Sequence, residues 1–269
     1  MEIEVKIWNS RVADAISNSF CYNSDMTNLI RQSLPTHKED FKSDLRWITK
    51  ESPHYVFYYF LDSVAERDIK IIEEIQEKSF EKIISFLSVE KPKQKIEYYF
   101  YPDRETKIEL MGDSGYAQAV FKDFTVHCLY TDEHKPIGEH EDTHLLSLPL
   151  GLATGFFAEG LAECLSWDRI VLGKTKTEWL KEGAGKILAV EKMVTHQDWM
   201  NTPNDTFMYY YSFTGFFVGK LIEQFGINTF KSFYQEINRD MKFEDINRVF
   251  VKFFKEDIVS YSKNLVVLS

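Results

Sequence analysis

The sequence lacks the usual marks of a secreted chain. Cysteine is scarce: the 269 residues contain only Cys21, Cys128 and Cys164, an odd number without paired spacing, which excludes a disulfide framework. Residues 1–6 have neither the basic start nor the apolar core of a signal peptide. We therefore expect a cytoplasmic protein, with the reservation that a leader removed beforehand would leave no trace.

Long apolar runs and an excess of basic residues are also absent. The most apolar stretch, residues 145–158, is too short to cross a membrane and contains Pro149. Lysine and arginine number 32 against 42 aspartates and glutamates, a formal net charge of -10, and they are scattered along the chain. Because phosphate backbones are bound by basic stripes, we exclude nucleic acid as a partner. The short apolar stretch likewise excludes a membrane partner. The negative net charge predicts a mild preference for a cationic substrate segment.

What the sequence does contain is a His-Glu-x-x-His pattern at residues 140–144. On a helix, His140 and His144 lie one turn apart on the same face, so both imidazoles can bind a single metal ion. Glu141 then flanks the open coordination position, where it is placed to take a proton from water. The pattern alone is not proof, and a third ligand is required.

Glu159 supplies a carboxylate fifteen residues after His144. Pro149 and Gly151 end the first helix and make a turn, and a second helix starting near Thr154 would carry Glu159 back toward the metal. Two histidines, a glutamate and water form a ligand set of catalytic zinc. We predict one Zn²⁺ per chain on the two histidines and Glu159.

Glu163 lies one helical turn after Glu159, on the same face. A histidine that binds a metal usually donates its other ring N–H to a carboxylate or carbonyl. We assign Glu159 to the metal and Glu163 to the second ring nitrogen of a ligand histidine, and the spacing leaves the reverse assignment open.

The flanks of this site carry a wider pattern. Glu159 to Glu163 read Glu-Gly-x-Ala-Glu in an aromatic-rich helix. With this helix and the 140–144 motif, the chain resembles the gluzincin peptidases, and most of all the peptidase MA-like domains. The resemblance implies a zincin-like fold and a zinc metallopeptidase. It covers about residues 52–240 and includes an upstream strand, long helix, strand and turn (54–62, 63–87, 95–101, 102–105) and a downstream helix that opens with Tyr and ends in Gly (211–226).

Two departures from that group bear on specificity. Residues 115–121 lack the Gly-x-Met-Glu-Asn signature with which gluzincin aminopeptidases hold a free amine, so we expect an endopeptidase rather than an aminopeptidase. The gap between His144 and Glu159 is shorter than in many gluzincins, so substrate selection must come from elsewhere. Residues 115–121 are either an exposed edge strand that pairs with an extended peptide or an ordinary buried strand.

The order of patterns predicts an α+β, zincin-like fold: a small mixed sheet with a long helix, then a mostly helical C-terminal half, with the active site at the junction. Hydrophobic residues make up 44% of the chain and aromatic residues 15%, enough for a sizeable core.

We expect an N-terminal extension, residues 1–50, with a strand at 2–8 and a helix at 26–34. It should pack on a catalytic domain, residues 51–269, which comprises a sheet part with the zinc helix (51–150) and a helical part (151–269). Within it we expect strands at 55–61, 95–101, 115–121 and 125–130, a helix capped by Ser63 and Glu66, and later helices at 179–193, 207–225, 229–238 and 243–255.

Tyr211 is the candidate for stabilising the oxyanion of a tetrahedral intermediate, because a phenol can donate a hydrogen bond to developing charge. The family resemblance favours this role, whereas core packing is the alternative for a tyrosine at a helix start. His196 is a second candidate for the same role.

We interpret the sequence as a zinc-dependent peptidase that cleaves a peptide or protein substrate, with Glu141 as general base. One alternative is a catalytically silent zincin-like domain that acts as a binding scaffold, against which the intact Glu141 argues. Another is a hydrolase of a non-peptide amide or ester. The sequence leaves the substrate, the substrate-binding residues and the oligomeric state open.

Overall fold

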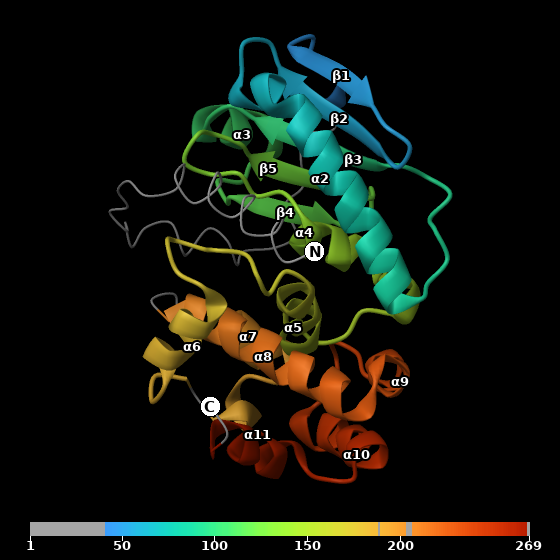
Figure 1. Ribbon diagram of the computed structural model, residues 1–269, viewed down its shortest axis with the longest axis vertical. Helices are drawn as coiled ribbons and strands as arrows, with labels where there is room; N and C mark the ends of the chain where they lie inside the picture. Colours follow the sequence, from blue (N-terminus) through green and yellow to red (C-terminus); the bar gives the residue numbers. More distant parts are fainter. Residues whose placement is uncertain (1–40, 188, 203–205, 268–269) are drawn as a thin grey trace, which may run out of the picture.

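The computed structural model describes residues 41–187, 189–202 and 206–267, and its elements fall into two halves (Figure 1). A sheet with its covering helices forms the first half, and a group of helices forms the second. The expected strand at 2–8 and helix at 26–34 lie outside the described residues, as does most of the expected N-terminal extension.

The described part of the chain contains a five-stranded mixed sheet with the spatial order β1-β2-β3-β5-β4. The inner strands β2, β3 and β5 run parallel, while each edge strand runs antiparallel to its neighbour. The long helix α2 connects β2 to β3 and packs across one face of the sheet (Figure 1). The strands are β1 (Trp47–Glu51), β2 (Tyr55–Phe60), β3 (Ile96–Tyr101), β4 (Ala117–Val120) and β5 (Thr125–Leu129).

Four of these strands lie within two residues of their predicted ends, and β1 is additional. It pairs with β2 along its whole length, from Trp47 opposite Phe60 to Glu51 opposite Val56. β1 therefore spans the expected boundary at residue 50 and belongs to the sheet. As a half-exposed edge strand, β1 lacks the continuous apolar run by which the inner strands are recognised.

Helix α2 spans Val64–Leu87 and begins where the sequence predicts. The hydroxyl of Ser63 accepts a hydrogen bond from the backbone N–H of Glu66 at 3.1 Å. The Glu66 carboxylate accepts from the N–H of Asp62 at 2.6 Å, so the expected reciprocal bond to Ser63 is replaced by one to the residue before it. Ile72, among other apolar side chains of this helix, is fully buried against the sheet.

The opposite face of the sheet is covered by a helix that we did not predict, α3 (Arg104–Met111). Leu110 and Met111 of this helix join Tyr99 and Tyr101 of β3 in a second, smaller apolar cluster. The cap is Asp103, whose carboxylate accepts from the N–H of Thr106 at 2.7 Å. Residues 102–105 are thus a helix start as well as a turn.

The C-terminal half is helical, as expected, but with different breaks. A continuous helix over 179–193 was wrong: α6 ends at Gly183, and Gly185 in the following turn has φ +82°, a conformation that favours glycine. Helices α7 and α11 were not predicted. The helices after β5 are α4 (Glu139–Leu146), α5 (Gly155–Leu165), α6 (Lys176–Gly183), α7 (His196–Met200), α8 (Phe207–Phe225), α9 (Ile227–Glu236), α10 (Phe243–Phe254) and α11 (Ile258–Val267).

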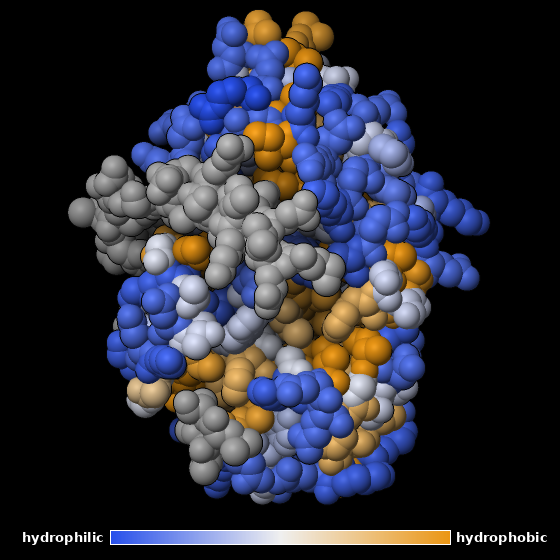
Figure 2. All heavy atoms as spheres, in the orientation of Figure 1, coloured by the Kyte–Doolittle hydropathy of each residue, from blue (hydrophilic) through white to orange (hydrophobic). Residues whose placement is uncertain are grey.

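The chain is therefore α+β, with helices α4 and α5 at the junction of the two halves (Figure 1). On the face shown in Figure 2, hydrophilic residues cover the outer side of α2, and hydrophobic residues gather around α5 between the halves. Among the described helices, none combines the length and apolarity needed to span a membrane.

Glycines set the close approach of α5 and α8. A Cβ atom added to Gly160 would lie 2.6 Å from Cγ2 of Val218 and 2.8 Å from the carbonyl oxygen of Thr214. On α8, a Cβ added to Gly215 would lie 2.7 Å from Cβ of Glu163. The two helix backbones therefore touch where α5 carries its glutamates, and no larger residue fits this contact without movement.

We expect Gly160→Ala to destabilise the fold by about 1–3 kcal/mol, because the new methyl group meets a backbone carbonyl. Urea unfolding measures this change. Gly219→Ala is the matched control, since its Cβ would meet only Sγ of Cys164 at the ordinary distance of 3.5 Å. Equal stability of the two variants would contradict the tight packing of α5 on α8.

Candidate metal centre

Helix α4 is tied to the sheet by a buried carboxylate within the motif. Asp142 is fully buried and accepts hydrogen bonds from the hydroxyls of Tyr55 and Tyr98, each at 2.6 Å, and from Nε2 of Gln76 at 3.0 Å. Burial raises the pKa of Asp142 to about 7, although the two tyrosine hydrogen bonds lower it. The same Gln76 accepts from the N–H of Gly138 at 2.5 Å through its side-chain oxygen. These bonds hold α4 with Asp142 turned toward α2 and the sheet.

The opposite side of α4 presents the two histidines to Glu159 of α5. Nε2 of His140 and Nε2 of His144 each lie 3.3 Å from Oε2 of Glu159. All three donor atoms lie within 4.8 Å of one another. The structure therefore brings together the three predicted metal ligands, from two helices separated by the turn after α4.

These distances fit a zinc ion. A tetrahedron with zinc–ligand bonds of about 2.0–2.1 Å has edges of about 3.3–3.4 Å, which matches both histidine–glutamate distances. Oε2 of Glu159 is buried, and among the described residues its contacts are the two imidazole nitrogens at 3.3 Å, an arrangement that a cation between the three atoms would stabilise. Two imidazoles and a carboxylate leave the fourth position of the tetrahedron for water or substrate.

Glu163 contacts the other ring nitrogen of His140, with Oε1 at 2.9 Å from Nδ1. Burial opposes the imidazolium, but hydrogen bonds with Glu159 and Glu163 raise the pKa of His140 to about 10. The pKa of Glu163 is lowered to about 2, because its contacts with His140 and Lys176 outweigh the effect of burial. The geometry places Glu159 at the Nε2 atoms and Glu163 at Nδ1, which corresponds to the assignment we favoured over its reverse.

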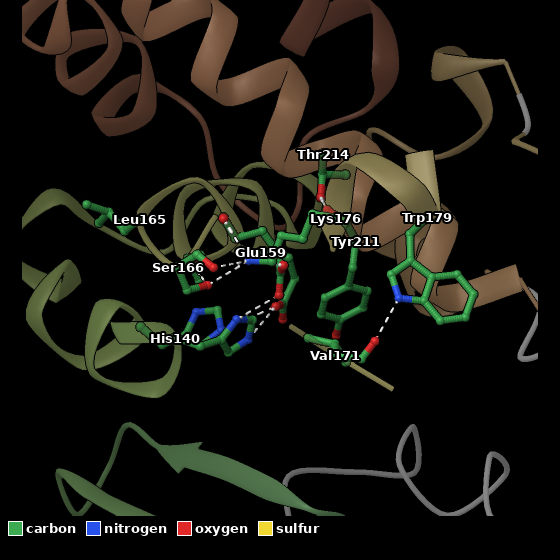
Figure 3. Close-up of polar contacts among 12 residues, drawn as sticks. His140, Glu159, Leu165, Ser166, Val171, Lys176, Trp179, Tyr211 and Thr214 are labelled. Carbon is green, nitrogen blue, oxygen red and sulfur yellow. Dashed lines mark hydrogen bonds and ion pairs between the residues drawn. The ribbon is translucent and has the colours of Figure 1, made fainter. Parts of the chain in front are cut away.

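Lys176, at the start of α6, completes this chain of contacts and was missed in the sequence. Its side chain is 1% exposed and its Nζ lies 2.6 Å from Oε2 of Glu163. It also donates to the carbonyl oxygens of Glu163 (2.9 Å) and Ser166 (2.6 Å) and to the hydroxyl of Ser166 (2.9 Å), as Figure 3 shows. A lysine in a loop-to-helix junction has no local signature, so only the fold reveals that it neutralises Glu163.

Glu141 lies on α4 between the two histidines and is partly buried. Its neighbour Asp142 is committed to the hydrogen bonds with α2 and the sheet, whereas no hydrogen bond or ion pair within the described residues engages the Glu141 carboxylate. A carboxylate so placed can accept a proton without first breaking a structural contact.

Tyr211 of α8 lies beside the metal ligands. Its ring centroid is 6.2 Å from that of His140, and the ring is flanked by Trp199 and Phe207 at 5.4 and 4.9 Å. In Figure 3 the phenol extends from α8 along the same side as the Glu159 carboxylate. His196 begins α7, and the described ring contacts connect Tyr211 rather than His196 to the ligand histidines.

Neither the family models nor the curated proteins with which the chain was compared gives a match. The proposed function therefore depends on the geometry of this centre.

We expect Lys176→Met to destabilise the protein by roughly 3–5 kcal/mol, because it removes the buried ammonium that is paired with Oε2 of Glu163. In urea unfolding, the double variant Glu163→Gln/Lys176→Met should recover part of this loss. Lys174→Met is the control: its ion pair with Glu182 at 2.7 Å is exposed, so the change should stay within about 1 kcal/mol. Equal losses in the two single variants would contradict a role for Lys176 in neutralising Glu163.

Proposed function

We propose that the chain is a zinc-dependent peptidase of the gluzincin type, with a zincin-like fold, and that it acts as an endopeptidase. The observation that carries the proposal is the convergence of His140, His144 and Glu159 next to Glu141, with both imidazole Nε2 atoms 3.3 Å from Oε2 of Glu159. Zinc bound there would supply a Lewis acid for the scissile carbonyl. Side chains of the protein itself carry out the proton transfers and stabilise the oxyanion.

Glu141 accepts a proton from the attacking water and returns it to the leaving nitrogen. Tyr211 donates a hydrogen bond to the oxyanion that develops as water adds to the carbonyl. Glu163, held as an anion by Lys176, keeps the Nδ1–H of His140 in a hydrogen bond and so directs Nε2 toward the metal position.

Strand β4 supports an extended peptide as substrate. It has β5 on one side and, within the described residues, no strand on the other. Helix α4 packs beside it, so the free edge of the sheet lies along the metal-bearing helix. An extended peptide can add to such an edge through backbone hydrogen bonds, which favours the edge-strand interpretation of residues 115–121 over the buried one.

Replacing Glu141 tests the proposal against the alternative of a silent scaffold. We expect the purified full chain to contain about one zinc by elemental mass spectrometry and to cleave quenched fluorescent peptides. Glu141→Gln should retain the zinc and lose roughly 10²–10⁴-fold in kcat, because the general base is gone. A chain that stays free of zinc after zinc is supplied, or that cleaves no peptide with zinc bound, would reject the peptidase assignment.

Tyr211→Phe should lower kcat by roughly 10²-fold and leave KM and zinc content nearly unchanged, because the lost hydrogen bond forms only as charge develops. Steady-state kinetics measures both constants. Tyr209→Phe is the control on the same helix, since the Tyr209 hydroxyl accepts from Lys186 at 2.9 Å. If His196→Gln lowers kcat and Tyr211→Phe does not, the oxyanion role passes to His196.

A further inference from the structure

Arg239 lies between α9 and α10 and has no carboxylate partner among the residues that the structure describes. Its Nε is buried without a hydrogen-bond partner, and no ion pair of its guanidinium is found within the described residues. Three other arginines have such partners: Arg46 lies 2.7 Å from an aspartate oxygen, Arg67 2.6 Å and Arg248 3.0 Å. A partly buried guanidinium without a carboxylate partner in the described part of the chain is suited to binding an anion.

Arg239 lies next to the metal centre. Its Cζ is 5.5 Å from the ring centroid of Phe121, and that ring is 6.5 Å from the ring of His144. A single aromatic side chain therefore links the guanidinium to a metal ligand. Tyr234 also lies near both groups. Burial raises its pKa to about 12, and the charges of both Arg239 and Glu159 act on its hydroxyl.

A second unpartnered nitrogen lies near Arg239. Nδ1 of His196 is buried and has no hydrogen-bond partner among the described residues. Burial and the positive charge of Arg239 lower the pKa of His196, against the opposing charge of Asp240. The two groups come from different elements, His196 from the start of α7 and Arg239 from the turn after α9.

We propose that Arg239, with His196 beside it, binds a carboxylate of the peptide substrate. The inference rests on the proposed peptidase function and gives it a substrate class. Arginine presents a planar fork of donors that matches a carboxylate, and stacking on Phe121 holds that fork in place. The carboxylate is either an acidic side chain or the C-terminus of the peptide.

The position of Phe121 explains how a substrate reaches this pair. Phe121 directly follows β4, so a peptide extended along this edge passes the Phe121 ring. Because an extended chain advances about 3.3–3.6 Å per residue, a carboxylate about two to four residues from the scissile bond reaches Arg239. Recognition of an anion here differs from the cationic segment that the net charge of the chain suggested.

Binding to the full-length Glu141→Gln protein, loaded with zinc, tests the inference without turnover. The probes are fluorescein-labelled alanine hexapeptides with one glutamate at each position in turn, as C-terminal amides, their glutamine counterparts, and an all-alanine pair with a free or amidated C-terminus. Fluorescence anisotropy should show at least tenfold tighter binding for one acidic probe than for its neutral counterpart. A glutamate position identifies a side-chain site, and the free-acid probe identifies a C-terminal site.

Arg239→Met should abolish this difference while Arg248→Met preserves it, because Arg248 is already paired with Asp245. Arg239→Lys, which keeps the charge and loses the fork, should retain part of the preference. Thermal unfolding and zinc content show whether each variant is intact.

The inference would be overturned if all acidic and neutral probes bound equally well or if none bound. It would also be overturned if the preference for an acidic probe survived Arg239→Met in a folded protein. The proposed function fails separately. Cleavage of neutral and acidic peptides at equal rates by the wild type keeps the peptidase and rejects the carboxylate site. If the protein cleaves no peptide but its preference for acidic probes is lost in Arg239→Met, the carboxylate site is supported and the peptidase function is rejected.

Discussion

The structure depends on the three hydrogen bonds that the buried carboxylate of Asp142 accepts. Tyr55 belongs to β2, Tyr98 to β3 and Gln76 to α2, so a single side chain fixes α4 against three other elements. Successive residues of a helix are about 100° apart around its axis, so holding Asp142 inward turns His140 and His144 outward toward α5. Loss of these bonds would leave polar groups buried without partners, which is why the helix has one stable rotation.

A second constraint acts from the helical half. Gly160 and Gly215 let α5 lie directly on α8, and Lys176 holds Glu163 in place from the start of α6. The ligand helices are therefore anchored in different halves of the molecule, α4 by hydrogen bonds to the sheet and α5 by backbone contact with α8. The carboxylates of α5 meet the imidazoles of α4 only because both anchors hold, so the spacing needed for a metal is a property of the whole domain.

The features that could be predicted from the sequence are those with a local signal. The 140–144 motif, the aromatic inner strands and the long helix after Ser63 all depend on residues a few positions apart, and the structure places these elements where expected. Asp142, Lys176 and Arg239 were missed because their roles depend on partners far away in the chain. The Tyr55 and Tyr98 hydroxyls that bind Asp142, for example, are separated from it by 87 and 44 positions. The break after α6 has a local signal in Gly183 and Gly185, which the prediction of a continuous helix overlooked; only the packing of Gly183 against Tyr209 of α8 depends on a distant residue.

The charge distribution around the centre follows from the same two anchors. Glu159 and Glu163 bring two negative charges into a buried position, and a buried anion needs a cation or several hydrogen bonds. Lys176 neutralises Glu163 from the inside, which leaves Glu159 for the metal. Arg239 contacts the Phe121 ring and forms no ion pair with either glutamate among the described residues. The short connection between α4 and α5 leaves little room for selective contacts beside the metal. A selective group must therefore come from an element outside the two ligand helices, and the proposed role of Arg239 would assign it to the turn after α9.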